Sequence, residues 1–207
     1  MKFKVLMIDL DGVIRRWDGQ DNQIEPAYGL PKGAIRQIAF ASDLLSLAVT
    51  GRITDEEWRR RITERLQQEF SSARAAEAVI EWSRPAGEVD WETVSILRNC
   101  DPSVKRGLIT NATTRLDRDL AELGILNEFA LVINSSAVGF AKPSRKIYEI
   151  ALQHADAKPS EALFIDDTDR HVRATEELGI TGHVFSTHEN LRDFLMQARV
   201  LLSSSAF

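Results

Sequence analysis

The stretch Lys4-Val5-Leu6-Met7-Ile8-Asp9-Leu10-Asp11-Gly12-Val13 joins a short apolar run to two carboxylates one residue apart and a glycine. A continuous apolar run of this length is typical of a strand that is buried on both faces of a sheet. Because side chains two residues apart on a strand point the same way, we expect Asp9 and Asp11 to share one side of the strand end. Two like charges there are unfavourable unless a cation or a proton neutralises them, which indicates a chemical role.

Further short apolar runs alternate with helical patterns in the second half of the chain. These runs cover residues 106–110, 130–133, 162–165 and 183–185. Short apolar strands that alternate with helices predict an α/β fold, with a Rossmann-like parallel sheet in three layers. In such sheets the ligand binds beyond the carboxyl ends of the strands.

A long helical stretch interrupts this alternation between the first and second apolar runs. Pro85 and Gly87 end the helical pattern. We therefore predict a helical cap domain over residues 15–84, inserted into a catalytic core domain formed by residues 1–14 and 85–207.

Three helix starts carry capping signals. Thr54 and Glu57 have the spacing of a capping box, and so do Ser186 and Glu189. Asp90 is the expected N-cap of a helix that begins at Trp91.

Composition limits the function classes that the chain can serve. The net charge of −5 argues against a general nucleic-acid binder, which would need an excess of basic side chains facing the phosphates. The single cysteine, Cys100, excludes an intramolecular disulfide and fits a reducing compartment. No apolar stretch approaches the roughly 20 residues of a membrane span, and the N-terminus does not resemble a signal peptide. We therefore expect a cytoplasmic protein that binds neither nucleic acid nor membrane.

Polar and charged side chains follow several of the predicted strands, or the loops between them, and should meet at one edge of the sheet. They are Asp9, Asp11, Thr110, Asn111, Lys142, Asp166 and Asp167. Carboxylates suit a hard divalent cation such as Mg²⁺, while an ammonium and a hydroxyl suit phosphate oxygens. One aspartate can attack phosphorus, and another can protonate the leaving oxygen and then activate water.

This set resembles the haloacid dehalogenase superfamily, whose four motifs occur here in order. They are Asp9-Leu10-Asp11-Gly12-Val13, Leu108-Ile109-Thr110-Asn111, Lys142-Pro143 and Phe164-Ile165-Asp166-Asp167. The inserted helices are similar to that family's class one cap. Within them, residues 51–58 are similar to a cap-helix start found among relatives of the epoxide hydrolase phosphatase domain and of sugar-phosphate phosphatases.

The resemblance implies catalytic roles for three residues. Asp9 would be the nucleophile, Asp11 the general acid and base, and Lys142 would stabilise the charge of the nucleophile and the phosphoryl group. Dehalogenases of the superfamily lack an aspartate at the position of Asp11, so the resemblance favours a phosphatase.

The same resemblance implies the binding residues. Thr110 and the backbone of Asn111 would hold the phosphoryl group. Mg²⁺ would be the cofactor, held by Asp9, the Asp11 carbonyl and Asp167, with Asp166 assisting directly or through water.

Two further residues are expected near the predicted site. His171 stands where family members of this type often carry asparagine, and we interpret it as a structural group near the metal site rather than a catalytic one. Trp17 lies in the loop that leaves the catalytic strand, so we expect it to line the substrate entrance and contact the substrate.

The expected function is a Mg²⁺-dependent phosphatase that hydrolyses a small phosphorylated metabolite through an aspartyl-phosphate. A phosphomutase of the sugar-phosphate type and a regulatory protein with weakened catalysis share these residues and stay as alternatives. Thr110 and Asn111 could instead cap the following helix, and Asp166 and Asp167 could be an acidic pair at a helix N-terminus. We expect a monomer or homodimer.

Overall fold

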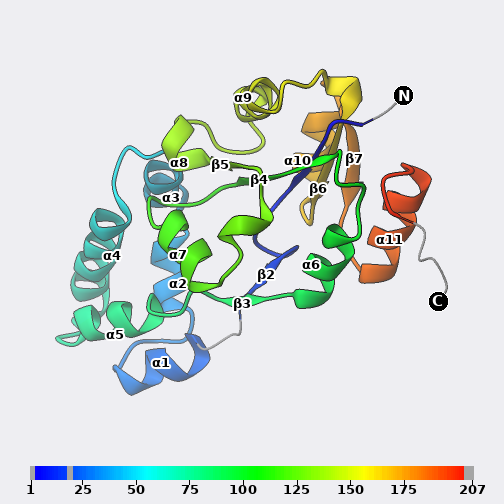
Figure 1. Ribbon diagram of the computed structural model, residues 1–207. Coiled ribbons are helices and arrows are strands. Elements are labelled where there is room, and N and C mark those ends of the chain that lie inside the picture. The colour runs from blue at the N-terminus through cyan, green and yellow to red at the C-terminus, as the bar shows by residue number, and fades with distance from the viewer. Residues whose placement is uncertain (1–2, 18–20, 203–207) are drawn as a thin grey trace.

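A computed structural model describes residues 3–17 and 21–202 and places a parallel sheet at the centre of the molecule (Figure 1). The five strands stand in the order β5-β4-β1-β6-β7, and every neighbouring pair is parallel. They are β1 (Val5–Ile8), β4 (Lys105–Thr110), β5 (Leu131–Asn134), β6 (Ala162–Asp166) and β7 (Thr181–Val184). The predicted α/β fold with a parallel sheet is thus confirmed.

The central strand β1 is buried on both faces because its side chains alternate between two apolar cores. Leu6 and Ile8 belong to one core, and Val5 and Met7 belong to the other. The first core takes in α6 (Trp91–Arg98), α7 (Leu116–Glu122) and α11 (His188–Gln197). The second takes in α9 (Arg145–Ala155) and α10 (Asp169–Glu176). Short helical turns complete the connections as α8 (Ser135–Val138), η1 (Leu126–Glu128) and η2 (Pro159–Glu161).

The helices between β1 and α6 pack around a third apolar core that they form among themselves. They are α1 (Asp21–Ala27), α2 (Ala34–Ala39), α3 (Ser42–Val49), α4 (Asp55–Phe70) and α5 (Ala75–Trp82). The spacing of Trp58, Ile62, Leu66 and Phe70 predicts one apolar stripe on α4; the first three are buried in this core, and Phe70 is partly buried against it. We call these helices, residues 21–82, the helical insertion; they lie to one side of the sheet in Figure 1.

A two-stranded antiparallel ribbon connects the helical insertion to the sheet. Strand β2 (Arg15–Arg16) carries the chain toward the insertion, and β3 (Glu88–Val89) receives it afterwards. Asp90 follows β3, caps α6 by accepting from the Thr93 N–H, and also contacts Arg16 and His188. The ribbon is therefore tied to α6 and to α11.

The helix caps agree with the sequence in part. Thr54 accepts from the Glu57 N–H as predicted, but the Glu57 carboxylate pairs with Arg60 and Arg61 and does not complete the box. The predicted second box was wrong by one position, because Thr187 accepts from the Asn190 N–H and is the N-cap of α11.

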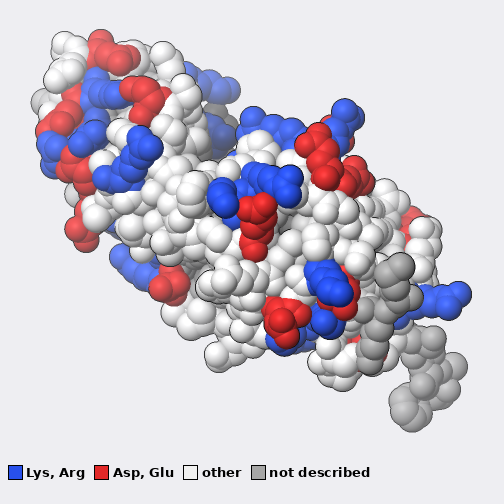
Figure 2. Space-filling model, turned by 90° about the horizontal axis from the view of Figure 1, so that it is seen from above, with Lys and Arg blue, Asp and Glu red and all other residues white. Residues whose placement is uncertain are grey.

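Exposed charged side chains form pairs of opposite sign on the surface. Lys and Arg side chains are interspersed with Asp and Glu side chains on the face seen in Figure 2. On α4 the exposed Arg60 pairs with Glu57, and Arg65 pairs with Asp43 of α3, as expected for a solvated helix face. Within the described parts of the chain, no helix has both the length and the apolar character needed to cross a bilayer.

Candidate active site

The carboxyl ends of β1, β4 and β6 meet at a cavity of about 300 Å³. Six of the residues predicted from sequence line it, together with Gly12, Thr168 and His171. These six are Asp9, Asp11, Thr110, Asn111, Lys142 and Asp167. Asp166 lies behind the cavity wall, fully buried, and Trp17 lines a second cavity that adjoins the first.

Lys142 connects two buried carboxylates. Its Nζ lies 2.6 Å from Asp9 Oδ1 and 2.7 Å from Asp166 Oδ2, and all three side chains are almost completely buried. A buried cation between two anions neutralises charge that water cannot reach. Lys142 is thus placed to hold the Asp9 carboxylate in position.

The environments of these two carboxylates shift their acidity in opposite directions. Burial raises the pKa of Asp9 to about 7, although the Lys142 ammonium opposes this rise. Burial also acts to raise the pKa of Asp166, but hydrogen bonds from His171 and Lys142 hold that pKa below its ordinary value. Asp166 is therefore a fixed anion, while the charge on Asp9 depends on what else occupies the cavity.

Three carboxylates are close enough to share one metal ion. Asp9, Asp166 and Asp167 each place one oxygen within 4.8 Å of the others. An all-oxygen set of this kind fits Mg²⁺. Gly12 contributes by having no side chain: it has a φ of +80°, and a Cβ built there would overlap the Asp167 carboxylate. The residues present therefore fit the predicted magnesium site.

Asp166 is already bonded on several sides. Its Oδ1 accepts from the Thr168 N–H at 2.8 Å, and His171 Nδ1 lies 3.1 Å from each of its carboxylate oxygens. His171 reaches it from the buried face of α10, and its Nε2 has no hydrogen-bond partner among the described residues. This contact explains the histidine that stands at the asparagine position: it supports the buried carboxylate.

Asp11 is held by two residues of the segment that leads to the helical insertion. Arg15 binds it through two hydrogen bonds of 2.7 and 2.9 Å, and Trp17 donates its indole N–H to Asp11 Oδ1 at 2.7 Å. Arg15 is buried and also pairs with Asp119 of α7 at 3.1 Å. The role of Arg15 as a partner of Asp11 was not predicted from the sequence. The signal that could have indicated it is the spacing of four residues between the two opposite charges.

Thr110 and Asn111 have different surroundings. Thr110 Oγ1 is buried and has no hydrogen-bond partner in the described chain, so its hydroxyl is available to a ligand. The Asn111 amide donates to the Lys142 carbonyl at 2.9 Å and accepts from the Lys142 N–H at 2.7 Å. Neither residue caps α7, whose N-cap is Arg115. Asn111 thus fixes the loop that carries Lys142.

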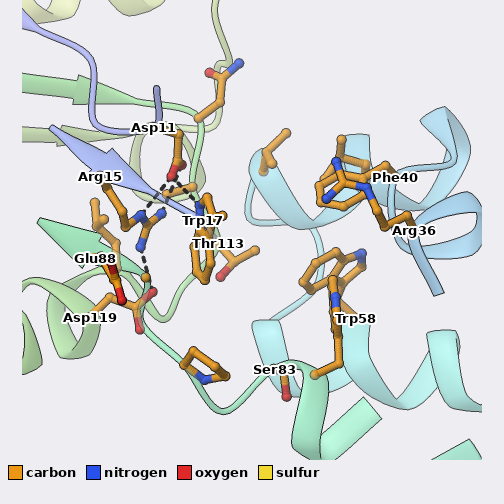
Figure 3. Close-up of a pocket in the computed structure, with 18 residues that line it drawn as sticks. Asp11, Arg15, Trp17, Arg36, Phe40, Trp58, Ser83, Glu88, Thr113 and Asp119 are labelled. Carbon is orange, nitrogen blue, oxygen red and sulfur yellow. Dashed lines mark hydrogen bonds and ion pairs between the residues drawn. The ribbon is translucent and has the colours of Figure 1, made fainter. Parts of the chain in front are cut away.

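A second cavity, of about 540 Å³, opens between the sheet and the helical insertion and shares Asp11 and Asn111 with the first. Figure 3 shows Asp11, Arg15 and Trp17 on one side of it and Phe40 and Trp58 on the other. This cavity leads from the Asp11 carboxylate to the helical insertion.

Comparison with known proteins agrees with this geometry. A family model described as a haloacid dehalogenase-like hydrolase matches residues 3–179. Haloacid dehalogenase-like hydrolase domain-containing protein 3 from Mus musculus is 26% identical over 69% of this chain and 53% of its own length. Bifunctional epoxide hydrolase 2 from Rattus norvegicus is 25% identical over 93% of this chain and 38% of its own. The chain therefore spans 53% and 38% of the length of these two curated relatives.

Solved structures share the fold. A HAD family enzyme from Bacteroides thetaiotaomicron, in complex with magnesium and inorganic phosphate, aligns with a TM-score of 0.70 at 22% identity, over 89% of this chain and 94% of its own. L-2-haloacid dehalogenase from Xanthobacter autotrophicus aligns with a TM-score of 0.63 at 18% identity, over 97% and 85%. From its motifs, its fold and the match to the family model, this chain belongs to the haloacid dehalogenase-like hydrolases.

Proposed function

We propose that the protein is a Mg²⁺-dependent phosphatase that hydrolyses a small phosphorylated metabolite through an aspartyl-phosphate on Asp9. The observation that carries this proposal is the placement of Asp9, Lys142 and Asp11 around one cavity of about 300 Å³. A carboxylate nucleophile, a fixed ammonium and a second carboxylate two residues on are the groups that phosphoryl transfer to an aspartate needs.

In the first step Asp9 attacks the phosphorus of the ester. The bond between phosphorus and the leaving oxygen breaks, and Asp11 gives its proton to that oxygen. In the second step Asp11 takes a proton from water, the water oxygen attacks phosphorus, and the bond to Asp9 breaks. Free phosphate leaves, and both aspartates return to their starting state.

The remaining residues bind and neutralise charge. The Thr110 hydroxyl and the Asn111 backbone N–H would hold the oxygens of the phosphoryl group, and Lys142 would offset the charge on Asp9. Asp9, Asp166, Asp167 and the Asp11 carbonyl are the groups that would hold Mg²⁺. When bound, the ion supplies positive charge to the carboxylates and to the phosphate oxygens.

The presence of Asp11 supports a phosphatase over a dehalogenase, because an ester intermediate on phosphorus benefits from a proton carrier beside the leaving group. The Arg15 ion pair, however, holds Asp11 as an acceptor. Asp11 must turn from Arg15 to donate a proton, and we infer that substrate binding in the adjoining cavity drives this turn.

We further propose that residues 15–84 act as a cap domain that excludes water and selects the substrate. The Arg15–Asp11 pair also favours a second candidate, a regulatory protein that binds Mg²⁺ and phosphate esters but turns them over slowly. A phosphomutase would use the same core residues.

Phosphate release tests these proposals. Wild type, Asp9→Asn and the matched control Asp43→Asn, which removes an exposed carboxylate from α3, would be assayed with an aryl phosphate and a metabolite panel, with and without Mg²⁺. We expect Mg²⁺-dependent release from wild type and Asp43→Asn and none from Asp9→Asn. Equal release from wild type and Asp9→Asn contradicts the mechanism; Mg²⁺ binding without release supports the regulatory candidate; an isomerised sugar phosphate without free phosphate supports a mutase.

A further inference from the structure

Aromatic side chains form two opposite walls of the larger cavity. On the sheet side, Trp17 is 48% exposed, with one face of its indole covered by the Arg15 guanidinium, which lies 4.6 Å from the ring centroid. Figure 3 shows Arg15 on the side of Trp17 that is remote from Phe40 and Trp58, so Arg15 does not lie between these rings.

The opposite wall is a cluster of rings from the helical insertion. Trp82 of α5 contacts Trp58 at 5.9 Å and Phe40, which follows α2, at 6.4 Å between centroids. Trp58 is fixed by burial and by its indole N–H, which donates to the Ala39 carbonyl at 3.2 Å. Phe40 is 47% exposed although it lines the cavity. These rings thus form the wall opposite Trp17, and the Arg36 guanidinium lies 5.1 Å from the Phe40 ring centroid, over one face of that ring.

Several polar side chains in the cavity wall are already bonded to other protein groups. Arg15 pairs with Asp11 and Asp119, and Thr113 donates to Asp55 at 2.8 Å. The Asn111 amide is bonded on both sides to the Lys142 backbone. A leaving group rich in hydroxyls would lose water here and find few free partners, which is unfavourable. Arg36 and Glu88 also line the cavity, and the exposed rings of Trp17 and Phe40 supply apolar surface that a ligand can meet.

We propose that this cavity binds a planar aromatic leaving group, so that the preferred substrates are phosphomonoesters of ring-bearing alcohols. The inference rests on the proposed function for the position of the phosphoryl group in the smaller cavity. Because Asp11 lines both cavities, a ring between Trp17 and Phe40 would have its ester oxygen beside the proposed proton donor. The cavity volume of about 540 Å³ suits a one- or two-ring group.

Planarity distinguishes this proposal from a site for an aliphatic chain. Stacked or edge-to-face rings gain attraction beyond the area that they bury, and a saturated ring of the same carbon skeleton does not. The faces of Trp17 and Phe40 therefore predict discrimination between aromatic and saturated forms of one ligand.

Binding of phosphonates, which cannot be hydrolysed, tests the site without turnover. Calorimetric titrations with Mg²⁺ present would compare 2-naphthylmethylphosphonate, its decahydro counterpart, the methylene phosphonate of glucose, and methylphosphonate. We expect the naphthyl probe to bind about three- to tenfold more tightly than the decahydro probe, and more tightly still than the sugar probe.

Substitutions locate the effect. Trp17→Leu and Phe40→Leu should each weaken binding of the naphthyl probe about three- to tenfold, and Phe40→Leu, which does not touch Asp11, should leave methylphosphonate binding unchanged within about twofold. Trp17→Phe, which keeps a ring and loses the N–H, should retain ring binding. Trp91→Leu is the matched control, because Trp91 is 53% exposed on α6 and does not line the cavity.

The outcomes separate the two proposals. Equal affinity for the naphthyl and decahydro probes, tighter binding of the sugar probe, or unchanged naphthyl affinity in both Leu variants overturns the aromatic site, even where phosphate release is intact. Ring binding that depends on Trp17 and Phe40, in a protein that releases no phosphate from any ester, supports the site and contradicts the phosphatase.

Discussion

The charge balance of the site depends on one residue. Lys142 is the described cation that contacts both Asp9 and Asp166, and each contact is shorter than 2.8 Å. Two buried carboxylates without it would repel each other and lack solvation. Lys142 is thus needed for the folded state as well as for the proposed chemistry.

Lys142→Met should lower the free energy of unfolding by about 3–5 kcal/mol, because it leaves buried charge unpaired. Urea unfolding followed by circular dichroism measures this. Adding Asp166→Asn to the variant should recover part of the loss. Lys146→Met, which removes an exposed lysine paired with Glu149, should change the free energy by about 0.5 kcal/mol or less. Similar values for both lysine variants would refute the charge argument.

Gly12 is required for a different reason: a side chain at this position would overlap the Asp167 carboxylate. Gly12→Ala should weaken Mg²⁺ binding by about tenfold or more, because the new Cβ displaces the Asp167 carboxylate. Gly139→Ala is the matched control: Gly139 has a φ of +79° and no atom within 4 Å of a built Cβ. It shares the backbone strain but should keep the affinity for Mg²⁺. Calorimetric titration with MgCl₂ measures the Mg²⁺ affinity of both glycine variants. An equal loss of affinity in the two variants would assign the effect to backbone strain alone.

The ionisation of the Cys100 thiol depends on its burial in the core, so its pH dependence tests that burial. Burial raises the pKa of its thiol from 9.0 to about 11, against the weaker influence of Arg106. The neutral thiol is favoured in the folded state, so its contribution to stability is complete below pH 9 and is lost as the pH rises through about 11. Labelling with a thiol reagent at pH 8 should therefore be slow in the native protein and fast in urea. Rapid native labelling would contradict this burial.

At the scale of elements, the start of α4 is the contact between the helical insertion and the loop after β4. Thr113 donates its hydroxyl to Asp55 Oδ1 at 2.8 Å, and the Asp55 N–H donates to Thr114 Oγ1 at 2.9 Å. That loop begins with Asn111, directly after Thr110 at the end of β4, so the contact ties the insertion to the candidate active site.

Thr113→Val should loosen this contact, because it removes one hydroxyl hydrogen bond between α4 and the loop. We expect faster hydrogen–deuterium exchange in the first turn of α4, with the rate rising by about three- to tenfold. Thr63→Val provides the control, since the Thr63 hydroxyl bonds to Arg59 within α4 itself. Equal exchange in the two variants would show that the contact does not hold the helix.

The elements themselves could largely be predicted, because they follow from local pattern. Apolar runs located all five strands of the sheet, and the spacing of Trp58, Ile62 and Leu66 gave the buried face of α4. The cap of α11 was misassigned because Ser186 and Thr187 are adjacent and both can act as N-cap; only the backbone conformation selects Thr187.

At the scale of the whole molecule, the residues that meet from distant positions divide into two groups. Those that occupy family motifs, such as Lys142 with Asp166, could be expected together from the resemblance to the family, although Lys142 lies in the loop between α8 and α9. Arg15 and Asp119 are 104 residues apart and belong to no motif, so their pairing depends on how the ribbon packs on α7. The same holds for the ring walls of the larger cavity, because the facing of side chains across two packed units is not encoded in local spacing.

The central claim is that Asp9 accepts a phosphoryl group. Beryllofluoride forms an adduct with aspartates that are built for phosphorylation, so it tests the claim without knowledge of the substrate. ¹⁹F NMR would be recorded for wild type, Asp9→Asn and the control Asp43→Asn, with and without Mg²⁺. A protein-bound fluoride resonance that requires Mg²⁺, is present in wild type and Asp43→Asn, and is absent in Asp9→Asn is the predicted result. No bound resonance in wild type, or the same resonance in Asp9→Asn, would contradict it.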